Sequence, residues 1–243
     1  MHPALLIVLL TLLAGLAMPA GALLARIEHI RPEWLEREFR HTVIAFGGGV
    51  LLSAVALVLV PDGARHVPLL AVVPLFLAGG LAFLGLDRLL ARTNSPASQL
   101  VAMLADFAPE ALALGTAFAT GESTGVLLAL LITLQNLPEG FNAYRELVAS
   151  GRVRPWHVIV VLFCLSPVGM LCALAGYYWL ADAHGLVASV MLFAAGGILY
   201  LTFQDIAPQA RLKNHHAPAF GAVLGFACGL IGQLVLTHVN QSA

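Results

Sequence analysis

The sequence predicts an all-α membrane protein with eight transmembrane helices. Hydrophobic residues make up 60% of the 243 residues and charged residues only 10%, whereas soluble domains have about 25% charged residues. The mean hydropathy is +0.90, and eight stretches supply the ~20 mainly apolar residues that a helix needs to cross a bilayer. Because lipid cannot satisfy exposed backbone groups, these spans must be helical.

The eight predicted spans follow one another without a separate linker, which indicates one transmembrane domain over residues 1–243. They cover residues 4–25, 41–61, 67–92, 98–120, 124–149, 157–181, 186–208 and 217–239. The first span ends in small residues, as a secretory signal does, but no Lys or Arg precedes it, which favours a membrane helix over a cleaved signal. Residues 26–40 alternate acidic and basic side chains and indicate a short solvated or interfacial helix.

Basic residues predict the orientation. All but one of the twelve Lys and Arg residues lie in or beside the loops that follow the first, third, fifth and seventh spans, and Arg65 lies on the other side. The positive-inside rule then puts these loops in the cytoplasm and both termini outside, for a multi-pass protein of the cell (inner) membrane. The net charge of −1 excludes a nucleic-acid-binding surface.

Two neighbouring spans carry polar residues at their centres. The fourth reads "DFAPEA" from Asp106 and the fifth reads "QNLPEG" from Gln135, so Pro-Glu pairs ending at Glu110 and Glu139 are 29 residues apart. Because consecutive spans run in opposite directions, these motifs form a small inverted repeat. Such inversion is typical of transporters that bind substrate near the membrane midplane.

A weaker repeat relates the second span to the seventh. Phe46 and Pro61 match Phe193 and Pro208 at the same offset of 147 residues. Together the two repeats predict an inverted-repeat bundle of three, two and three helices (3+2+3).

The spacing of the central polar residues favours a cation site. Asp106 and Glu110 are four residues apart, as are Gln135 and Glu139, so each pair shares a helix face. An ionised side chain at the bilayer centre costs about 2.5–3.5 kcal/mol on insertion scales, and no Lys or Arg lies at this depth. A proton or a divalent metal ion would neutralise the carboxylates, and oxygen ligands suit hard or borderline metals. The alternative is that these residues only form hydrogen bonds between helices.

These motifs, on the fourth and fifth of eight helices, resemble those of the ZIP (Zrt/Irt-like) family of divalent-metal transporters. "FLGLDRLL" (83–90) and "FQDIAPQA" (203–210) are similar to elements of the third and seventh helices of that family. The resemblance implies a homodimer and a metal path through the bundle. It also implies metal ligands at two stations, the central Asp106, Glu110, Gln135, Asn136 and Glu139 and the cytoplasm-side Asp87, Gln204 and Asp205.

The chain departs from the family pattern at several positions. Asp106 and Gln204 stand where the family has His, Asn136 and Gln209 where it has an acid, and Ser166 where it has a carboxylate. The resemblance therefore predicts a reduced metal centre without nitrogen ligands. Zinc prefers His and Cys, so an all-oxygen centre shifts the expectation toward Mn²⁺, Fe²⁺ or Mg²⁺, with Zn²⁺ still open.

The leading hypothesis is a divalent-cation carrier that works by alternating access toward the cytoplasm. The alternative is a non-transporting relative, a sensor or scaffold with a degenerate metal site. An enzyme is not expected, because the chain has no HExxH motif and no central His to activate Ser166. Ordinary roles are expected for the three Cys residues, as buried small hydrophobes, and for the solvated pair His215 and His216, which could otherwise collect metal.

Overall fold

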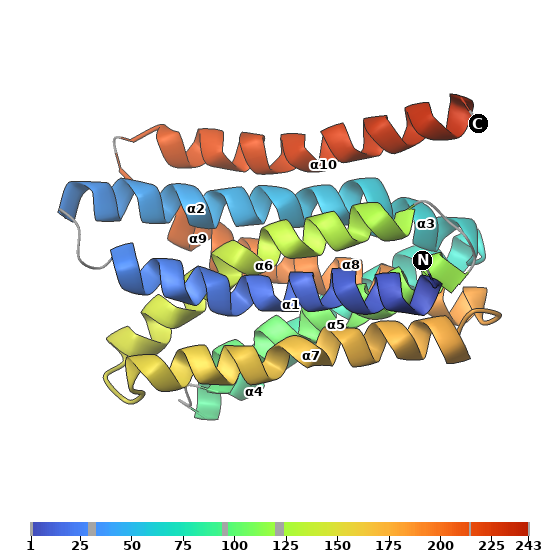
Figure 1. Cartoon of the computed structure of the whole chain (residues 1–243). Helices are drawn as coiled ribbons and strands as arrows, with labels where there is room; N and C mark the ends of the chain where they lie inside the picture. The colour runs from blue at the N-terminus through green and yellow to red at the C-terminus, as the bar shows by residue number, and fades with distance from the viewer. Residues whose placement is uncertain (1, 29–32, 94–96, 120–123, 214, 243) are drawn as a thin grey trace.

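The computed structural model describes residues 2–28, 33–93, 97–119, 124–213 and 215–242. Its long helices lie side by side in one bundle (Figure 1). They are α1 (Pro3–Glu28), α2 (Glu33–Ala54), α4 (Leu69–Thr93), α5 (Ala97–Ala119), α6 (Thr124–Ala149), α7 (Pro155–Trp179), α8 (His184–Leu201) and α10 (Ala217–Ser242). The short elements are η1 (Val55–Leu59), α3 (Val60–Arg65), η2 (Thr202–Ile206) and α9 (Ala207–Ala210).

Seven stretches of the described residues are long and apolar enough to cross a membrane. They are Pro3–Ile27, Glu38–Arg65, Leu69–Arg92, Thr124–Ala149, Pro155–Trp179, His184–Ala210 and Ala217–His238. The chain is therefore an all-helical, multi-pass membrane protein in the part that the structure describes. The fourth predicted span corresponds to α5, which packs against α6, α7 and α8 but is not among the seven. Its crossing of the membrane stays a prediction.

The basic helix ends gather at one end of the bundle. Helices α1, α4 and α6 end there and α2, α7 and α10 begin there, at the left of Figure 1, and we call this the basic end. The start of α1 and the finish of α10 lie together at the opposite end, which we call the termini end (Figure 1). The helical part of residues 26–40 extends α1 and α2 rather than forming a separate short helix, and residues 29–32 lie outside the described residues.

Two helices contain a π-helical turn directly before a proline. Turn η1 precedes Pro61 and turn η2 precedes Pro208. Proline lacks the backbone donor and its ring clashes with the carbonyl four residues earlier, so the wider turn relieves the clash. The backbone N–H groups of Val60 and Ala207 accordingly donate to the carbonyls five residues back, of Val55 and Thr202. The two turns are 147 residues apart, the offset that relates the second and seventh predicted spans.

The helices form two groups, and the contacts within a group differ from those between the groups. The first group contains α1, α5, α6 and α7, and the second contains α2, α4, α8 and α10 with the short elements. Within the second group, a Cβ added to Gly49 of α2 would overlap the carbonyl of Ala222 in α10, and one on Gly225 of α10 would overlap the carbonyl of Phe46. Small residues let the helix backbones approach closely, as in other membrane bundles.

A matching pair of contacts joins α4 to α8. A Cβ on Gly79 would overlap the carbonyl of Phe193, and one on Gly196 would overlap the carbonyl of Phe76. Contacts between the two groups differ, because Gly47 of α2 meets the ring of Pro138 in α6 rather than its backbone. Helices within a group therefore pack with their backbones in contact. Between α2 and α6 side chains lie in the contact, and we call this boundary between the two groups the seam.

Candidate functional site

Helix α6 carries a polar stripe along one face. Gln135, Glu139, Asn142 and Glu146 are spaced by four, three and four residues, so they follow one another along the same side of the helix. Proline 138 lies within this stretch, yet α6 remains one continuous helix through it. The stripe runs from the middle of the bundle toward the basic end (Figure 1).

A cavity of about 70 Å³ lies beside this stripe, in the seam between the two groups. Both groups line it, through α5 and α6 on one side and α2, α8, η2 and α9 on the other. Its polar lining residues are Asp106, Glu139, Asn142, Asp205 and Gln209, and the others are apolar or Gly. None of the described lining residues is Lys or Arg, so the cavity contains three acids without a basic partner among its lining.

The remaining central residues of the prediction do not line the cavity. Glu110 is fully buried, and its Oε2 accepts a hydrogen bond from Nε2 of Gln135. Asn136 is also buried, and its Nδ2 donates to the carbonyl oxygen of Ala14 in α1 at 2.8 Å. Of the five central residues, the structure thus brings Asp106 and Glu139 to the cavity and directs Asn136 toward a neighbouring helix.

Buried oxygen atoms without a donor are concentrated on α5 and α6. Those on α5 and α6 are Oε1 of Glu110, Oε1 of Gln135, Oδ1 of Asn136, both carboxylate oxygens of Glu139 and Oδ1 of Asn142, and α10 has one more, Oε1 of Gln233. Buried polar groups in proteins are almost always paired. Leaving one unpaired costs about 1–3 kcal/mol, and more for charged groups. Unpaired acceptors are thus more frequent along α5 and α6 than the usual pairing of buried polar groups would predict.

The carboxylates do not form a compact cage. Among the residues that the structure describes, no three His, Cys, Asp or Glu side chains lie close enough together to hold a metal ion. Asp106 and Glu110 lie four residues apart on α5, and Glu139 lies on α6, which packs against α5. The oxygens are therefore distributed along the seam, and amide oxygens make up part of the set.

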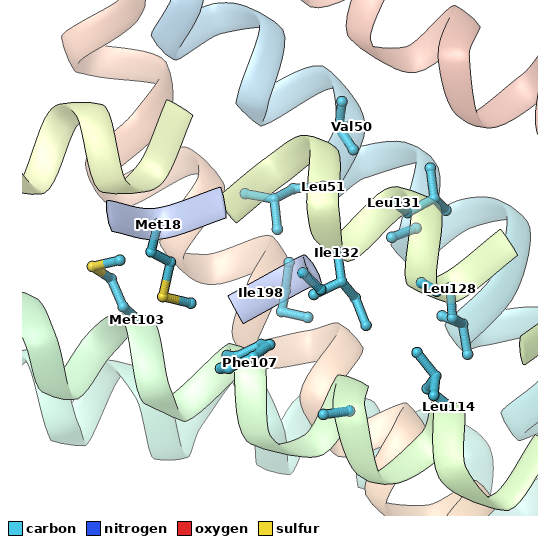
Figure 2. Packing of buried hydrophobic residues seen from close by; sticks show 14 of the residues in the cluster. Met18, Val50, Leu51, Met103, Phe107, Leu114, Leu128, Leu131, Ile132 and Ile198 are labelled. Carbon is cyan, nitrogen blue, oxygen red and sulfur yellow. The ribbon is translucent and has the colours of Figure 1, made fainter. Parts of the chain in front are cut away.

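Apolar side chains close the seam on the termini side of the cavity. Figure 2 shows Leu114, Leu128, Ile132 and Ile198 pointing into the space between the helices. Leu114, Leu128, Ile132 and Ile198 are each at most 1% exposed. We call these four residues the apolar plug.

The three residues of the predicted cytoplasm-side station have different surroundings. Asp205 lines the central cavity. Asp87 lies within α4, six residues before its end, and its Oδ2 accepts a hydrogen bond from the hydroxyl of Tyr200 at 2.9 Å. Gln204 is exposed. The described residues therefore connect only Asp205 to the central site.

Ser166, His215 and the three cysteines do not line the central cavity. The single proton of the Ser166 hydroxyl lies between two carbonyl oxygens, that of Leu162 at 3.0 Å within α7 and that of Gly15 at 2.9 Å in α1. Nδ1 of His215 lies 3.4 Å from Oε1 of Glu38. The three cysteines are free; Cys164 is exposed, whereas Cys172 and Cys228 are partly buried and Cys172 packs against the hydrophobic core. The expectation that all three are buried was therefore wrong.

Asn142 was not singled out by the sequence, although the cavity includes it. Its Nδ2 donates to Glu146 Oε1 at 3.0 Å and to Gln209 Oε1 at 2.8 Å. Extending the helical stripe of Gln135 and Glu139 by one further turn would have found it. The Pro-Glu motif ends at Gly140 and therefore does not include Asn142.

Comparison with known proteins gives distant similarities. No family model matches the chain. It is similar to the human zinc transporter SLC39A7, with 27% identity over 151 residues that cover 58% of this chain and 31% of the human protein. The protein of the same name from Canis lupus familiaris is 26% identical over 149 residues, covering 58% of this chain and 31% of the dog protein. Zinc transporter zipt-7.1 of Caenorhabditis briggsae is 26% identical over 125 residues, covering 49% and 32%. The matches thus span 31–32% of the length of these curated relatives, and they support metal transport in general terms.

Proposed function

We propose that the chain is a divergent member of the ZIP family that carries a divalent metal cation across the membrane through the seam between α2, α5, α6 and α8. The observation that carries this proposal is the set of six buried acceptor oxygens without donors on α5 and α6. A distant similarity to zinc transporters supports the same function class.

Three of these oxygens, both of Glu139 and Oδ1 of Asn142, belong to residues that line the cavity, where a cation would accept their lone pairs. At about 1–3 kcal/mol each, six unpaired acceptors would cost about 6–18 kcal/mol, which is comparable to the entire stability of a typical domain. One proton satisfies one acceptor at a time, whereas a divalent cation accepts lone pairs from several oxygens at once.

The packing supports an alternating-access mechanism. The cavity lies in the seam between the two helix groups, and the apolar plug separates it from the termini end. Movement of one group against the other would open the plug and close the cavity toward the basic end. Such relative movement of two repeats around a fixed site is a common transporter mechanism.

An inverted repeat of the first three and last three spans is part of this proposal. The π-helical turns at an offset of 147 residues support it. So do the reciprocal glycine contacts, since Gly49 and Gly225 join α2 to α10 as Gly196 and Gly79 join α8 to α4. The positive-inside rule orients the basic end toward the cytoplasm, so that both termini lie outside.

Ligand chemistry and the similar proteins favour different metals. Oxygen ligands alone favour Mn²⁺, Fe²⁺ or Mg²⁺, and the relatives are zinc transporters. The proposal is therefore a divalent-cation carrier whose selectivity an uptake assay would rank. A homodimer rests on the family resemblance alone.

Uptake into proteoliposomes tests the proposal. Purified chain is reconstituted and loaded with a metal-sensitive dye, and uptake of Zn²⁺, Mn²⁺ and Fe²⁺ is followed. Substitutions Glu139→Ala and Glu110→Ala are expected to abolish uptake, whereas Asp182→Ala, an exposed acid outside the spans, is expected to retain it. Uptake that is unchanged in both central variants would defeat the proposal.

The second candidate function is a non-transporting sensor or scaffold. Ser166 lying between two backbone carbonyls and Asn136 bonded to Ala14 favour it, because these family ligand positions serve helix packing here. Calorimetry on the purified chain separates a scaffold from a carrier. A scaffold with a degenerate site binds no divalent cation, whereas the carrier binds at least one and loses it on Glu139→Ala.

A further inference from the structure

Asn142 lies beside the path that a cation would follow from the central acids. It is three residues beyond Glu139 on the same face of α6, which is about 4.5 Å along the helix toward the basic end. Both residues line the same cavity. The Oδ1 atom of Asn142 is buried and has no donor, and the same holds for both carboxylate oxygens of Glu139.

Neighbouring acceptors determine which way the Asn142 amide points. Its Nδ2 donates to Glu146 Oε1 at 3.0 Å and to Gln209 Oε1 at 2.8 Å. An ionised carboxylate only accepts hydrogen bonds, so a flipped amide would bring Oδ1 against the Glu146 oxygen. The two bonds therefore hold Nδ2 on one side and keep Oδ1 as an acceptor on the other.

We propose that Oδ1 of Asn142 is a direct ligand of the cation as it leaves Glu139 for the basic end, with Glu146 and Gln209 as positioning residues. This inference rests on the proposed transport function. The ligand class is a neutral amide oxygen, which hard divalent cations accept from Asn and Gln side chains. Because it carries no charge, it holds the ion less tightly than Glu139 does, and conduction requires such graded binding.

The bond to Gln209 links this ligand to the arrangement of the helix groups. Asn142 belongs to α6 in the first group and Gln209 to α9 in the second. The amide is therefore held in its orientation by both groups together. Relative movement of the groups would release Asn142 from Gln209 while leaving its bond within α6 to Glu146.

Substitutions at Asn142 distinguish a ligand from a packing residue. In the full-length protein in nanodiscs, Mn²⁺ binding is measured by electron paramagnetic resonance, and uptake is measured in proteoliposomes. Asn142→Ala is expected to raise the KM for Mn²⁺ uptake at least about tenfold, at the lower end of losses for metal-site substitutions. Asn142→Asp loses the same two donated hydrogen bonds but keeps an oxygen at this position and adds charge, so it is expected to bind Mn²⁺ as tightly as the unsubstituted chain or more tightly and to release it more slowly.

Three results would overturn the assignment. One is an unchanged KM in Asn142→Ala, and the second is an equal loss of Mn²⁺ binding in Asn142→Ala and Asn142→Asp, which would indicate a packing role. The third result applies if Asn142→Ala does not fold: Asn142→Asp then binds Mn²⁺ more weakly than the unsubstituted chain does. Gln233→Ala is the matched control, because this α10 amide also has a buried unpaired oxygen and does not line the cavity.

A parallel measurement on Glu139→Ala separates this inference from the proposed function. If Glu139→Ala abolishes uptake while Asn142→Ala leaves it unchanged, only the assignment of Asn142 fails. If Glu139→Ala also leaves Mn²⁺ binding and uptake unchanged, the transport function itself fails, and the inference fails with it.

Discussion

We expect Glu139→Gln to be more stable than the unsubstituted protein in chelator and less stable than it when a divalent cation is added. The Glu139 carboxylate is buried with no hydrogen-bond donor on either oxygen. A charge at this depth costs about 2.5–3.5 kcal/mol on insertion scales. In chelator, at a pH where Glu139 is ionised, the neutral amide of Glu139→Gln should therefore make the folded protein more stable, by at most about 2.5–3.5 kcal/mol.

Added cation should favour the unsubstituted protein. A ligand at 1,000 times its Kd stabilises the folded state by about 4.1 kcal/mol. With about 2–4 °C per kcal/mol for a chain of this size, its Tm should rise by about 8–16 °C, and that of Glu139→Gln should rise far less. The unsubstituted protein is then the more stable of the two.

Thermal unfolding in nanodiscs measures both effects, with chelator and then with Mn²⁺, Zn²⁺ or Mg²⁺. Asp182→Asn serves as the control for loss of a carboxylate at an exposed position. Equal cation-dependent shifts in the unsubstituted protein and in Glu139→Gln would refute the reasoning. So would the absence of any shift in the unsubstituted protein with all three cations.

Three further predictions concern packing, the apolar plug and orientation. Gly196→Val should destabilise the bundle by at least about 1–3 kcal/mol, because its side chain would overlap the Phe76 carbonyl, and a Tm equal to that of the unsubstituted protein would contradict this contact. Ile132→Ala should cost about 2–5 kcal/mol and allow leak of cations through the closed seam, measured as dye response in proteoliposomes, and a tight vesicle would argue against the plug. In a chain without other cysteines, Arg65→Cys should react with a membrane-impermeant reagent added to whole cells, because position 65 is expected outside. Arg152→Cys should react only after the cells are opened. The reverse labelling would contradict the predicted orientation.

The helices could be predicted from the sequence because apolar stretches of spanning length are a strong signal. Seven of the eight expected spans correspond to apolar helices of the structure within a few residues. The two central Pro-Glu pairs could also be recognised from the sequence, because carboxylates are rare in apolar stretches of spanning length. The structure adds that Glu139 and Asp106 share a cavity, whereas Glu110 bonds with Gln135 instead.

The composition of the cavity depends on contacts between distant segments, which spacing along one helix does not specify. Asp205 reaches the cavity from η2, where the π-helical turn shifts the faces of the residues that follow it. Asn136 turns toward Ala14 of α1, about 120 positions away in the chain. Asn142 could have been found from helical periodicity, but its partner Gln209 could not, because that contact joins two different helix groups.

The position of a bound cation tests the central claim most directly. Crystals of the full chain grown with Mn²⁺ or Zn²⁺ would be measured at the absorption edge of the metal. The account predicts an anomalous peak in the seam at about 2.0–2.3 Å from a carboxylate oxygen of Glu139. A fully occupied metal found only at surface residues such as His215, with the Glu139 oxygens paired to protein donors, would contradict it.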